Sequence, residues 1–375
     1  MQGIGIATLS AKNIPALTGI RAIAALLVLG IHVDQNVPTG IVSYLPFIGR
    51  GYLGVDFFFV LSGFIITHVY LASFRNLTWS ALRIFLWHRL IRLYPVHIAV
   101  LLVMIAMVWI AKAGGREISE AYFQPEDLIW HFLLLQAWGF VDVVSWNAPS
   151  WSISAEWFAY LLFPLMAPVL LFVRHWSTAI VLAIAALVIM TLICVATKWN
   201  LNSFVGAPAL LRVTCEFVCG AGICRFVTLI SPSDKSRWIG DVVATVAFGI
   251  FVGAASSGAS DFGLVALLAL TILGVSVANS FVAQILGSRI AVWLGEVSYS
   301  IYMIHFPILL VLRRVYEKMG YAAWSVPLQG LAFVAAIAIV IAAAAVLYHA
   351  IEKPMRTRLR DRMGVLASPE RLSAR

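Results

Sequence analysis

"LTGIRAIAALLVLGIHV", residues 17–33, is an apolar run of nearly the length that a membrane-spanning helix needs. Such a helix rises about 1.5 Å per residue and requires about 20 mainly apolar residues. The run nevertheless carries two ionisable side chains, Arg21 near one end and His32 near the other. Because an ionisable group inside a bilayer costs free energy, each is a candidate for a functional role.

The composition extends this interpretation to the whole chain. Of its 375 residues, 62% are hydrophobic and 11% are charged, whereas a soluble globular domain has about 25% charged residues. We therefore expect an integral membrane protein. The first run leads into further apolar spans without a clear small-residue cleavage site, which argues against a secretory signal peptide. The net charge of +9 is typical of cytoplasmic loops and does not indicate nucleic-acid binding.

The apolar runs predict an all-α bundle of about ten transmembrane helices. Their expected ranges are 17–33, 52–72, 92–111, 152–173, 177–197, 207–229, 238–256, 262–281, 291–312 and 324–348. Residues 126–141 are apolar but polar at both ends, and there we expect a re-entrant or interfacial helix. The domains predicted are a cytoplasmic segment over 1–13, a transmembrane domain over 14–357 and a basic cytoplasmic tail over 358–375.

Basic residues predict the orientation of this bundle. If the N-terminus is cytoplasmic, 18 of the 26 Lys and Arg residues lie inside, seven lie outside, and Arg212 lies within a span. The seven predicted outside are Arg50, Lys112, Arg116, Lys198, Arg313, Arg314 and Lys318. This asymmetry favours two cytoplasmic termini. A full crossing by 126–141 would place the basic tail outside, which is why we expect none.

The four cysteines are expected to be small packing residues, because all lie in or beside apolar segments: Cys194, Cys215, Cys219 and Cys224. Neither a nearby His nor a second Cys-rich motif accompanies them, so we expect no metal site.

Arg21 and His32 share one helix face. Eleven residues turn a helix by three full turns plus about 20° and advance it by roughly 16 Å. The stripe therefore joins a fixed cation at the cytoplasmic surface to a proton acceptor in the outer half of the membrane. An imidazole titrates near neutral pH and can take a proton from a hydroxyl group. The alternative is a histidine satisfied by a neighbouring helix and an arginine that reaches the lipid headgroups.

Other spans carry polar residues at a similar depth. Glu156 in "SWSISAEWFAYLLFP" and His305 in "VSYSIYMIHFP" are expected near His32, and a carboxylate beside an imidazole can orient it and stabilise its protonated form. Asp56 in "GYLGVDFFFVLSGFII" is either functional or a helix N-cap. Ser62 has a local alternative too, a bond to a carbonyl one turn earlier.

Arginines mark two further places. Arg212 and Glu216 are spaced i, i+4, and a mutual ion pair is the simplest account of both. In "RIFLWHRLIRLYPVH", Arg89 and Arg92 are spaced i, i+3 at an expected helix start and close to Tyr94. Two guanidinium groups projecting together suit a phosphate. The alternative for Arg89 and Arg92 is ordinary positive charge on the cytoplasmic side.

Taken together, these motifs resemble membrane-bound acyltransferase family 3, which includes O-acetyltransferases of bacterial O-antigens, exopolysaccharides and nodulation factors. The resemblance extends from about residue 14 to residue 357. It is carried by the Arg21–His32 spacing, "GYLGVDFFFVLSGFII", "RLIRLYP", "PSWSISAEWFAYLLFP", "GEVSYSIYMIHFP" and "HAIEKPMR". The late motifs contribute Ser298, Tyr299, His305 and Glu352. Some members of the family carry a C-terminal extracytoplasmic hydrolase-like domain, and we expect none here.

The resemblance implies an O-acyltransferase of the bacterial inner membrane that uses acyl-CoA, usually acetyl-CoA, and a saccharide or lipid-linked glycan acceptor. Arg21, Arg89 and Arg92 would hold the CoA phosphates at the cytoplasmic surface. His32 would be the general base, with Glu156 orienting or charging it. Tyr299 and His305 are expected as donors to the developing oxyanion. The remaining motif residues would support the site or contact substrate: Asp56, Ser62, Tyr94, Arg212, Ser298 and Glu352.

Two other classes of function remain open on the sequence alone. Intramembrane His, Asp and Glu residues could serve a proton-coupled transporter or flippase, although no inverted repeat is evident. A structural membrane scaffold would tolerate replacement of His32 and Glu156. Neither the oligomeric state nor the acceptor is predicted by these motifs.

Overall fold

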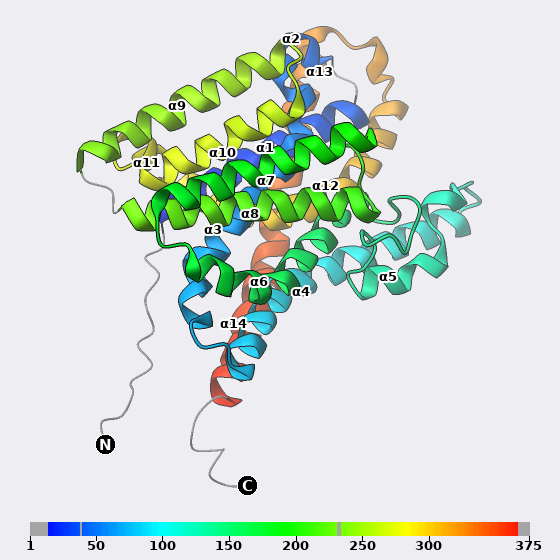
Figure 1. Ribbon diagram of the computed structural model, residues 1–375. Coiled ribbons are helices and arrows are strands. Elements are labelled where there is room, and N and C mark those ends of the chain that lie inside the picture. The colour runs from blue at the N-terminus through cyan, green and yellow to red at the C-terminus, as the bar shows by residue number, and fades with distance from the viewer. Residues whose placement is uncertain (1–13, 38–39, 231–233, 367–375) are drawn as a thin grey trace, which may run out of the picture.

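The computed structural model describes residues 14–37, 40–230 and 234–366, all of whose regular structure is helical. The predicted segment 1–13 and the end of the predicted tail, 367–375, lie outside the described residues. Ten long helices form the bundle: α1 (Pro15–Asn36), α3 (Gly54–Tyr70), α4 (Trp79–Ala113), α6 (Trp151–Phe172), α7 (Trp176–Thr197), α8 (Gly206–Ile230), α9 (Asp234–Ser256), α10 (Asp261–Val277), α12 (Arg289–Lys318) and α13 (Val326–Leu347) (Figure 1).

Shorter helical segments connect or follow them. The α-helical ones are α2 (Ile41–Tyr44), α5 (Leu128–Phe132), α11 (Phe281–Leu286) and α14 (Lys353–Leu366), and η7 (Tyr348–Glu352) is one π-helical turn. The 3-10 helical ones are η1 (Pro46–Leu53), η2 (Leu71–Phe74), η3 (Glu120–Tyr122), η4 (Pro125–Asp127), η5 (Ala148–Ser150) and η6 (Tyr321–Ala323).

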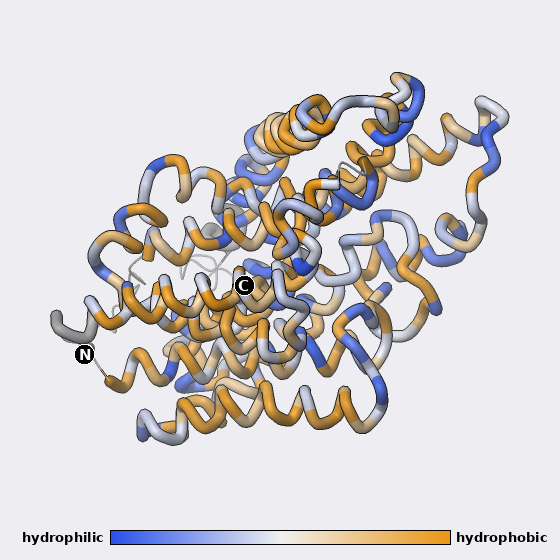
Figure 2. The backbone as a smooth tube through the Cα atoms, turned by 90° about the horizontal axis from the view of Figure 1, so that it is seen from above, coloured by the Kyte–Doolittle hydropathy of each residue, from blue (hydrophilic) through white to orange (hydrophobic). Residues whose placement is uncertain are grey.

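The polytopic all-α fold predicted from the apolar runs is confirmed. Within the described residues, nine helical stretches are long and apolar enough to cross a membrane, and α10 is a shorter apolar helix of 17 residues. Apolar residues follow the long helices along their lengths, and hydrophilic residues concentrate toward their ends and in the connections (Figure 2). Each of the ten predicted spans corresponds to one of the ten long helices.

The end of α10 differs from the expected span of 262–281. Its last helical residue is Val277, and the chain then turns around the carboxylate of Asp241 in α9. This carboxylate accepts hydrogen bonds from the Ser280 backbone N–H at 3.1 Å, the Ser280 hydroxyl at 2.7 Å and the Val282 N–H at 2.9 Å. This buried acidic side chain thus satisfies backbone N–H donors that the N-terminus of α11 leaves unpaired, and it fixes the turn.

The helix expected over 126–141 forms only in part. Its longest helical piece is α5, whose five residues rise only about 7.5 Å. His97 Nε2 in α4 lies 2.8 Å from the carbonyl of His131 in α5, and irregular backbone follows this short helix. Burial lowers the pKa of His131 to about 3, so this side chain is neutral at ordinary pH. Within the described residues, 126–141 forms no helix long enough to cross a membrane.

Two close helix contacts set the positions of the site residues. A Cβ atom on Gly220 of α8 would lie 1.8 Å from the carbonyl oxygen of Val60 in α3, and one on Gly295 of α12 would lie 1.8 Å from that of Thr18 in α1. Only glycine permits such an approach, as is common where membrane helices pack closely. These contacts hold α3 against α8 and α1 against α12.

The start of α4 and the end of the described chain lie together. The Trp87 indole N–H of α4 donates to the carbonyl of Leu359 in α14 at 3.1 Å. Figure 1 shows α14 beside the beginning of α4 and α5 at the far end of the molecule. We name these two ends of the bundle the α14 end and the α5 end.

Candidate active site

A cavity of about 130 Å³ lies between α1, α3, α4, α6 and α12. Its polar lining residues are Arg21, Ser62, Arg89, Arg92, Ser152, Glu156, Tyr160, Tyr299 and Tyr302. Valine, leucine, isoleucine and phenylalanine side chains complete its wall. The structure therefore brings together Arg21, Arg89, Arg92 and Glu156, four of the five residues predicted to bind the donor or to catalyse the reaction.

The cavity is electropositive because its three arginines are incompletely neutralised. Arg92 pairs with Glu352 of η7, and its guanidinium lies 5.1 Å from the centre of the Tyr299 ring. Arg89 donates from NH2 to the Tyr70 hydroxyl at 2.9 Å, while its buried Nε–H has no acceptor in the part of the chain that the structure describes. Among the described residues, neither Arg21 nor Arg89 has a carboxylate within ion-pair distance.

The location of Arg89 and Arg92 corrects one expectation. Because α4 begins at Trp79, they lie in the third and fourth turns of the helix and not at its start. The first turns of α4 place Arg83, His88 and Arg89 among apolar residues ahead of the continuous apolar run, so hydropathy alone placed the helix start too late. Both guanidinium groups face the cavity within the bundle, which makes them more protected than residues of a cytoplasmic loop.

Glu156 does not form the dyad expected with His32. Its Oε1 accepts hydrogen bonds from the Ser62 hydroxyl at 2.6 Å and the Tyr160 hydroxyl at 2.5 Å. The ring contact of His32 is instead with His305. The reason is packing. Helix α3 places Ser62 beside Glu156, and Tyr160 lies one helical turn after Glu156 on α6, so both hydroxyl groups reach the carboxylate.

His32 pairs with His305 at the closely packed contact of α1 and α12. Their ring centres are 4.8 Å apart in an edge-on arrangement. Nδ1 of His32 lies 2.8 Å from the carbonyl of Val28, and Nδ1 of His305 lies 2.6 Å from that of Tyr302. Because a carbonyl only accepts, each Nδ1 carries a proton, and in a neutral ring the lone pair then lies on Nε2. Among the described residues, the buried Nε2 of His305 has no hydrogen-bond partner.

These bonds bear on the predicted oxyanion donors, Tyr299 and His305. A neutral His305 has no proton to donate from Nε2. The Tyr299 hydroxyl already donates to the carbonyl of Leu93 at 2.5 Å. In this arrangement neither side chain has a donor available for a developing negative charge. Tyr302 connects the cavity to the histidines, because it lines the cavity and its ring centre lies 5.8 Å from that of His305.

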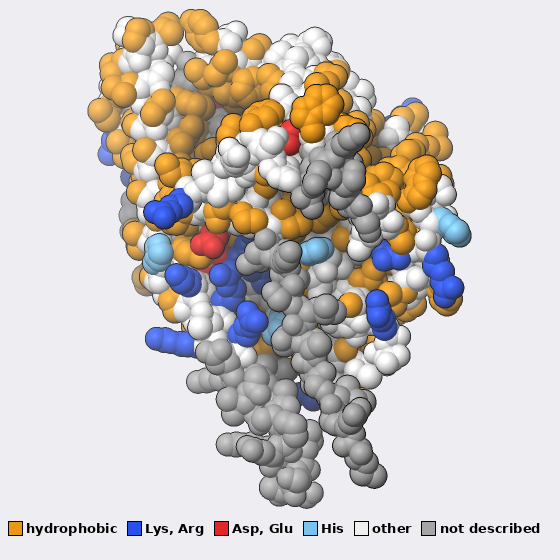
Figure 3. Space-filling model, turned by 90° about the vertical axis from the view of Figure 1, so that its left-hand side faces the viewer, with side chains coloured by type: hydrophobic (Ala, Val, Ile, Leu, Met, Phe, Trp, Pro, Cys, Tyr) orange, Lys and Arg blue, Asp and Glu red, His pale blue; other side chains and the backbone are white. Residues whose placement is uncertain are grey.

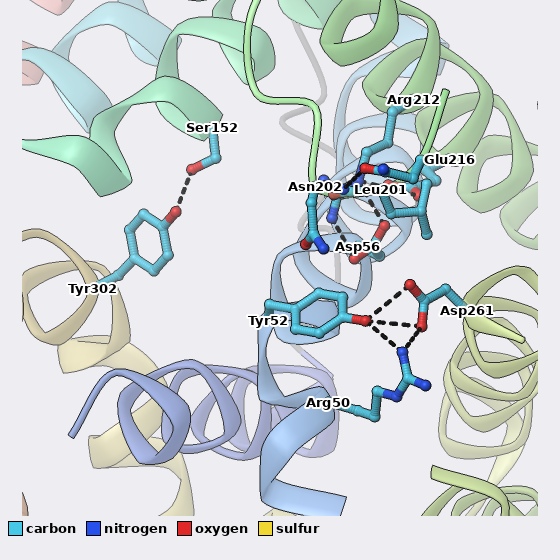
Figure 4. Close-up of polar contacts among 11 residues, drawn as sticks. Arg50, Tyr52, Asp56, Ser152, Leu201, Asn202, Arg212, Glu216, Asp261 and Tyr302 are labelled. Carbon is cyan, nitrogen blue, oxygen red and sulfur yellow. Dashed lines mark hydrogen bonds and ion pairs between the residues drawn. The ribbon is translucent and has the colours of Figure 1, made fainter. Parts of the chain in front are cut away.

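Asp56 and Arg212 form a second buried ion pair, away from the cavity lining. Arg212 Nε and NH2 donate to the two Asp56 oxygens at 2.7 and 2.6 Å, and NH1 donates to the carbonyl of Leu201 at 2.5 Å. Figure 4 shows Glu216 beside this pair, with its closest oxygen 3.9 Å from Arg212 Nε (Figure 4). The i, i+4 pair expected for Arg212 and Glu216 is therefore secondary. Asp56 is the third residue of α3 and pairs with Arg212 instead of capping the helix.

The other predicted residues have structural contacts. Tyr94 donates to the carbonyl of Phe132 at 3.1 Å, which ties α4 to the last residue of α5. The Ser298 hydroxyl donates to the carbonyl of Gly295 at 2.8 Å, within its own helix. Ser62 bonds to Glu156 and not to its own helix. All four cysteines are free and buried, as expected for packing residues, and no group of three metal-ligating side chains occurs among the residues described.

Sequence reasoning missed Ser152, Tyr160 and Tyr302, three hydroxyl groups that line the cavity. Ser152 Oγ and the Tyr302 hydroxyl lie 2.7 Å apart and link α6 to α12 (Figure 4). A signal was present, since Tyr160 follows Glu156 by four residues and Tyr302 follows Tyr299 by three. One turn of a helix places such residues on the same face.

The distribution of surface charge distinguishes the two ends of the bundle. Exposed cations on and next to α4 and α14 at the α14 end are Arg75, Arg83, Lys353, Arg358 and Arg360. The face seen in Figure 3 carries Lys and Arg side chains in its lower half, below a broad apolar surface (Figure 3). The three cavity arginines lie toward this same end, since Arg21 is the seventh residue of α1 and Arg92 contacts η7, next to α14.

Comparison with known proteins agrees with this site. A family model described as "Acyltransferase domain" matches residues 14–349. The chain is 26% identical to acyltransferase MdmB of Streptomyces mycarofaciens over 96% of its own length and 95% of that protein. It is 27% identical to the peptidoglycan O-acetyltransferase OatA of Listeria monocytogenes, matching 85% of this chain but only 53% of OatA, about half of that relative's length. No solved structure matches the chain.

The match covers the helices that build the cavity and the histidine pair, and it favours an enzyme over the transporter and scaffold alternatives. The predicted family is confirmed: the chain belongs to membrane-bound acyltransferase family 3 and is an acyltransferase enzyme embedded in a membrane.

Proposed function

We propose that this protein is an O-acyltransferase that moves an acyl group, acetyl in the simplest case, from cytoplasmic acyl-CoA to a saccharide hydroxyl on the opposite side of the membrane. The observation that carries the proposal is the electropositive cavity of Arg21, Arg89 and Arg92, separated from the His32–His305 pair by one aromatic ring. The naming of OatA as a peptidoglycan O-acetyltransferase supports a glycan hydroxyl as the acceptor, and peptidoglycan itself is one such glycan.

The donor would enter at the α14 end. CoA carries several phosphate groups, and a guanidinium group binds phosphate through paired N–H donors. The cation-rich α14 end would face the cytoplasm, as the positive-inside rule favours, with both termini on that side of the bacterial inner membrane. The narrow pantetheine arm would occupy the cavity, where Glu156 and its two hydroxyl neighbours would contact its polar groups.

His32 would then act as the general base. Its Nδ1–H is committed to the Val28 carbonyl, so Nε2 would take the proton from the acceptor hydroxyl. The hydroxyl oxygen attacks the thioester carbonyl, an ester bond forms, and the carbon–sulfur bond breaks. The proton held on His32 would pass to the departing CoA thiolate. Base catalysis of this kind is worth about 10²- to 10⁴-fold in rate.

The direct test is release of free CoA by the purified protein. Supplied with acetyl-CoA and a glycan acceptor, it should release CoA and produce an acetylated sugar in equal amounts, both of which mass spectrometry detects. A protein that binds acetyl-CoA but never forms an acylated product with any glycan would contradict the proposed function.

A further inference from the structure

A groove of about 730 Å³ lies between the C-terminal halves of α4 and α12, outside the cavity described above. Its walls are mainly apolar and include Met104, Met107, Val108, Ile110, Ala111, Leu310 and Val311. On α4 the groove extends from Met104 to Gly114, which is about 15 Å of helix. The hydrocarbon core of a bilayer is about 30 Å thick, so the groove matches the depth of one leaflet.

The mouth of the groove is cationic. Arg116, Arg313 and Arg314 line it, and an adjoining cavity of about 500 Å³ shares Arg116 and Arg314 and adds Lys318. Against these four cations stand two carboxylates, Glu117 and Glu317, which leaves a net charge of +2.

Most hydrogen-bond donors at this mouth are unused. Arg313 and Arg314 share one carboxylate, that of Glu317, at 2.9 and 3.1 Å. Their side chains remain 54% and 69% exposed. Each guanidinium group has five N–H donors, so both can bind another anion without losing Glu317.

Membrane topology does not explain this cluster. It lies at the α5 end, which the charge distribution predicts to be extracytoplasmic, and cations are expected chiefly on the cytoplasmic side. Of the seven cations predicted outside, four are at the mouth of this one groove: Arg116, Arg313, Arg314 and Lys318. An apolar channel one leaflet deep, open at a cationic mouth, has the shape and charge of an amphipathic anion.

We propose that this groove binds a lipid phosphate, with its hydrocarbon chain along α4 and α12 and its phosphate at Arg313, Arg314 and Arg116. We further propose that this lipid carries the saccharide that receives the acyl group; this second statement rests on the proposed function. Arg313 follows His305 by eight residues on α12, about 12 Å along the helix. A phosphate at this mouth would therefore lie about 12 Å along α12 from the histidine pair, and an attached saccharide would start there.

The test measures lipid binding by the full chain in phosphatidylcholine nanodiscs, by native mass spectrometry. The probe is a long-chain polyprenyl phosphate, compared with the polyprenol of equal length and with inorganic phosphate. The double variant Arg313→Gln/Arg314→Gln removes the phosphate contacts, and Ala111→Phe fills the groove without adding charge. The matched control is Lys198→Gln, an exposed cation elsewhere among those predicted outside.

We expect the wild type and the Lys198 variant to bind the polyprenyl phosphate at least about tenfold more tightly than the polyprenol, since each charge-assisted contact contributes that much. Both groove variants should lose about tenfold or more, with unchanged thermal unfolding. Equal binding of the polyprenol, displacement by inorganic phosphate, or wild-type affinity in both groove variants would overturn the proposal. The measurement needs no acyl-CoA, so lipid binding without acyl transfer would refute the proposed function and leave the groove assignment standing.

Discussion

Two buried arginine–carboxylate pairs sit in neighbouring parts of this bundle and have different surroundings. Arg212 donates hydrogen bonds from Nε and NH2 to Asp56 and from NH1 to the Leu201 carbonyl, and its side chain is 2% exposed. Arg92 pairs with Glu352 through NH1, is 14% exposed, and lines the cavity. The first pair is enclosed, and its arginine already makes three hydrogen bonds to protein atoms, whereas the second pair belongs to a cluster whose donors face an open cavity.

The difference shows that an ionisable residue in a membrane span is not by itself a site. Both arginines occupy apolar helices, so the sequence alone does not distinguish their roles. Their neighbours decide the role. Arg212 lies 5.2 Å from the Trp151 ring centre and holds α3 against α8, whereas Arg92 has Arg21 and Arg89 beside it around an open space. We therefore expect the Asp56–Arg212 region to govern stability and the cavity region to govern the reaction.

The largest expected effect tests the reactive side of the comparison. His32→Gln removes the basic Nε2 but keeps a polar side chain, so turnover should fall by about 10²- to 10⁴-fold. Thermal unfolding and acyl-CoA affinity should stay close to those of the wild type. His68→Gln, an exposed histidine on α3, is the matched control. Near-normal turnover in the His32 variant would show that His32 is not the general base.

The next effect tests the structural side. Arg212→Met leaves the Asp56 carboxylate buried without its partner, which should cost about 3–5 kcal/mol of unfolding free energy. Thermal unfolding in detergent measures this loss. The double variant Asp56→Leu/Arg212→Met removes both charges and should recover part of it. If Arg212→Met kept its stability and lost only acyl-CoA affinity, the two regions would have the same role and the comparison would fail.

A smaller effect concerns donor binding. Arg89→Ala should weaken acyl-CoA binding by about 1.5–3 kcal/mol, the value of one charge-assisted contact, and Arg89→Lys should recover only part because it lacks the planar fork. Arg92→Ala should show a similar loss plus reduced stability, since Glu352 then loses its partner. Titration calorimetry with acetyl-CoA measures both, with exposed Arg83→Ala on the same helix as the control. Unchanged affinity in both variants would leave these arginines as topology signals.

The smallest effect separates two roles for Glu156. As a partner of His32, it would change kcat alone when replaced by Gln. Its position beside Ser62 and Tyr160 in the cavity predicts that the KM for acyl-CoA also rises, by about 2- to 10-fold for one ordinary hydrogen bond. Steady-state kinetics of the Glu156→Gln variant distinguish the two roles of Glu156, and Glu126→Gln, at an exposed position, is the matched control. A fall in kcat at constant KM would restore the dyad predicted from the sequence.

The spans were predictable because a bilayer imposes long apolar runs, and the Arg21–His32 stripe was predictable because helical periodicity is a local property. Errors arose where a distant residue intervened. The carboxylate of Asp241, which lies on α9, fixes the turn that follows α10. Asp56 and Arg212 are separated by 156 residues in the sequence, so local patterns cannot predict that they pair. Likewise, the contact of Glu156 with Ser62 depends on how α3 and α6 pack. A single sequence contains the residues of the site, but not which helix faces which.

The measurement that tests the central claim most directly follows acyl transfer across sealed membrane vesicles of known orientation. We expect acetyl-CoA on the face that carries the α14 end to acetylate a membrane-impermeant glycan on the opposite face. His32→Gln vesicles should bind the donor and transfer nothing. Transfer that requires both substrates on the same face would contradict an account in which the donor enters beside the arginines and reacts beyond them at the histidine pair.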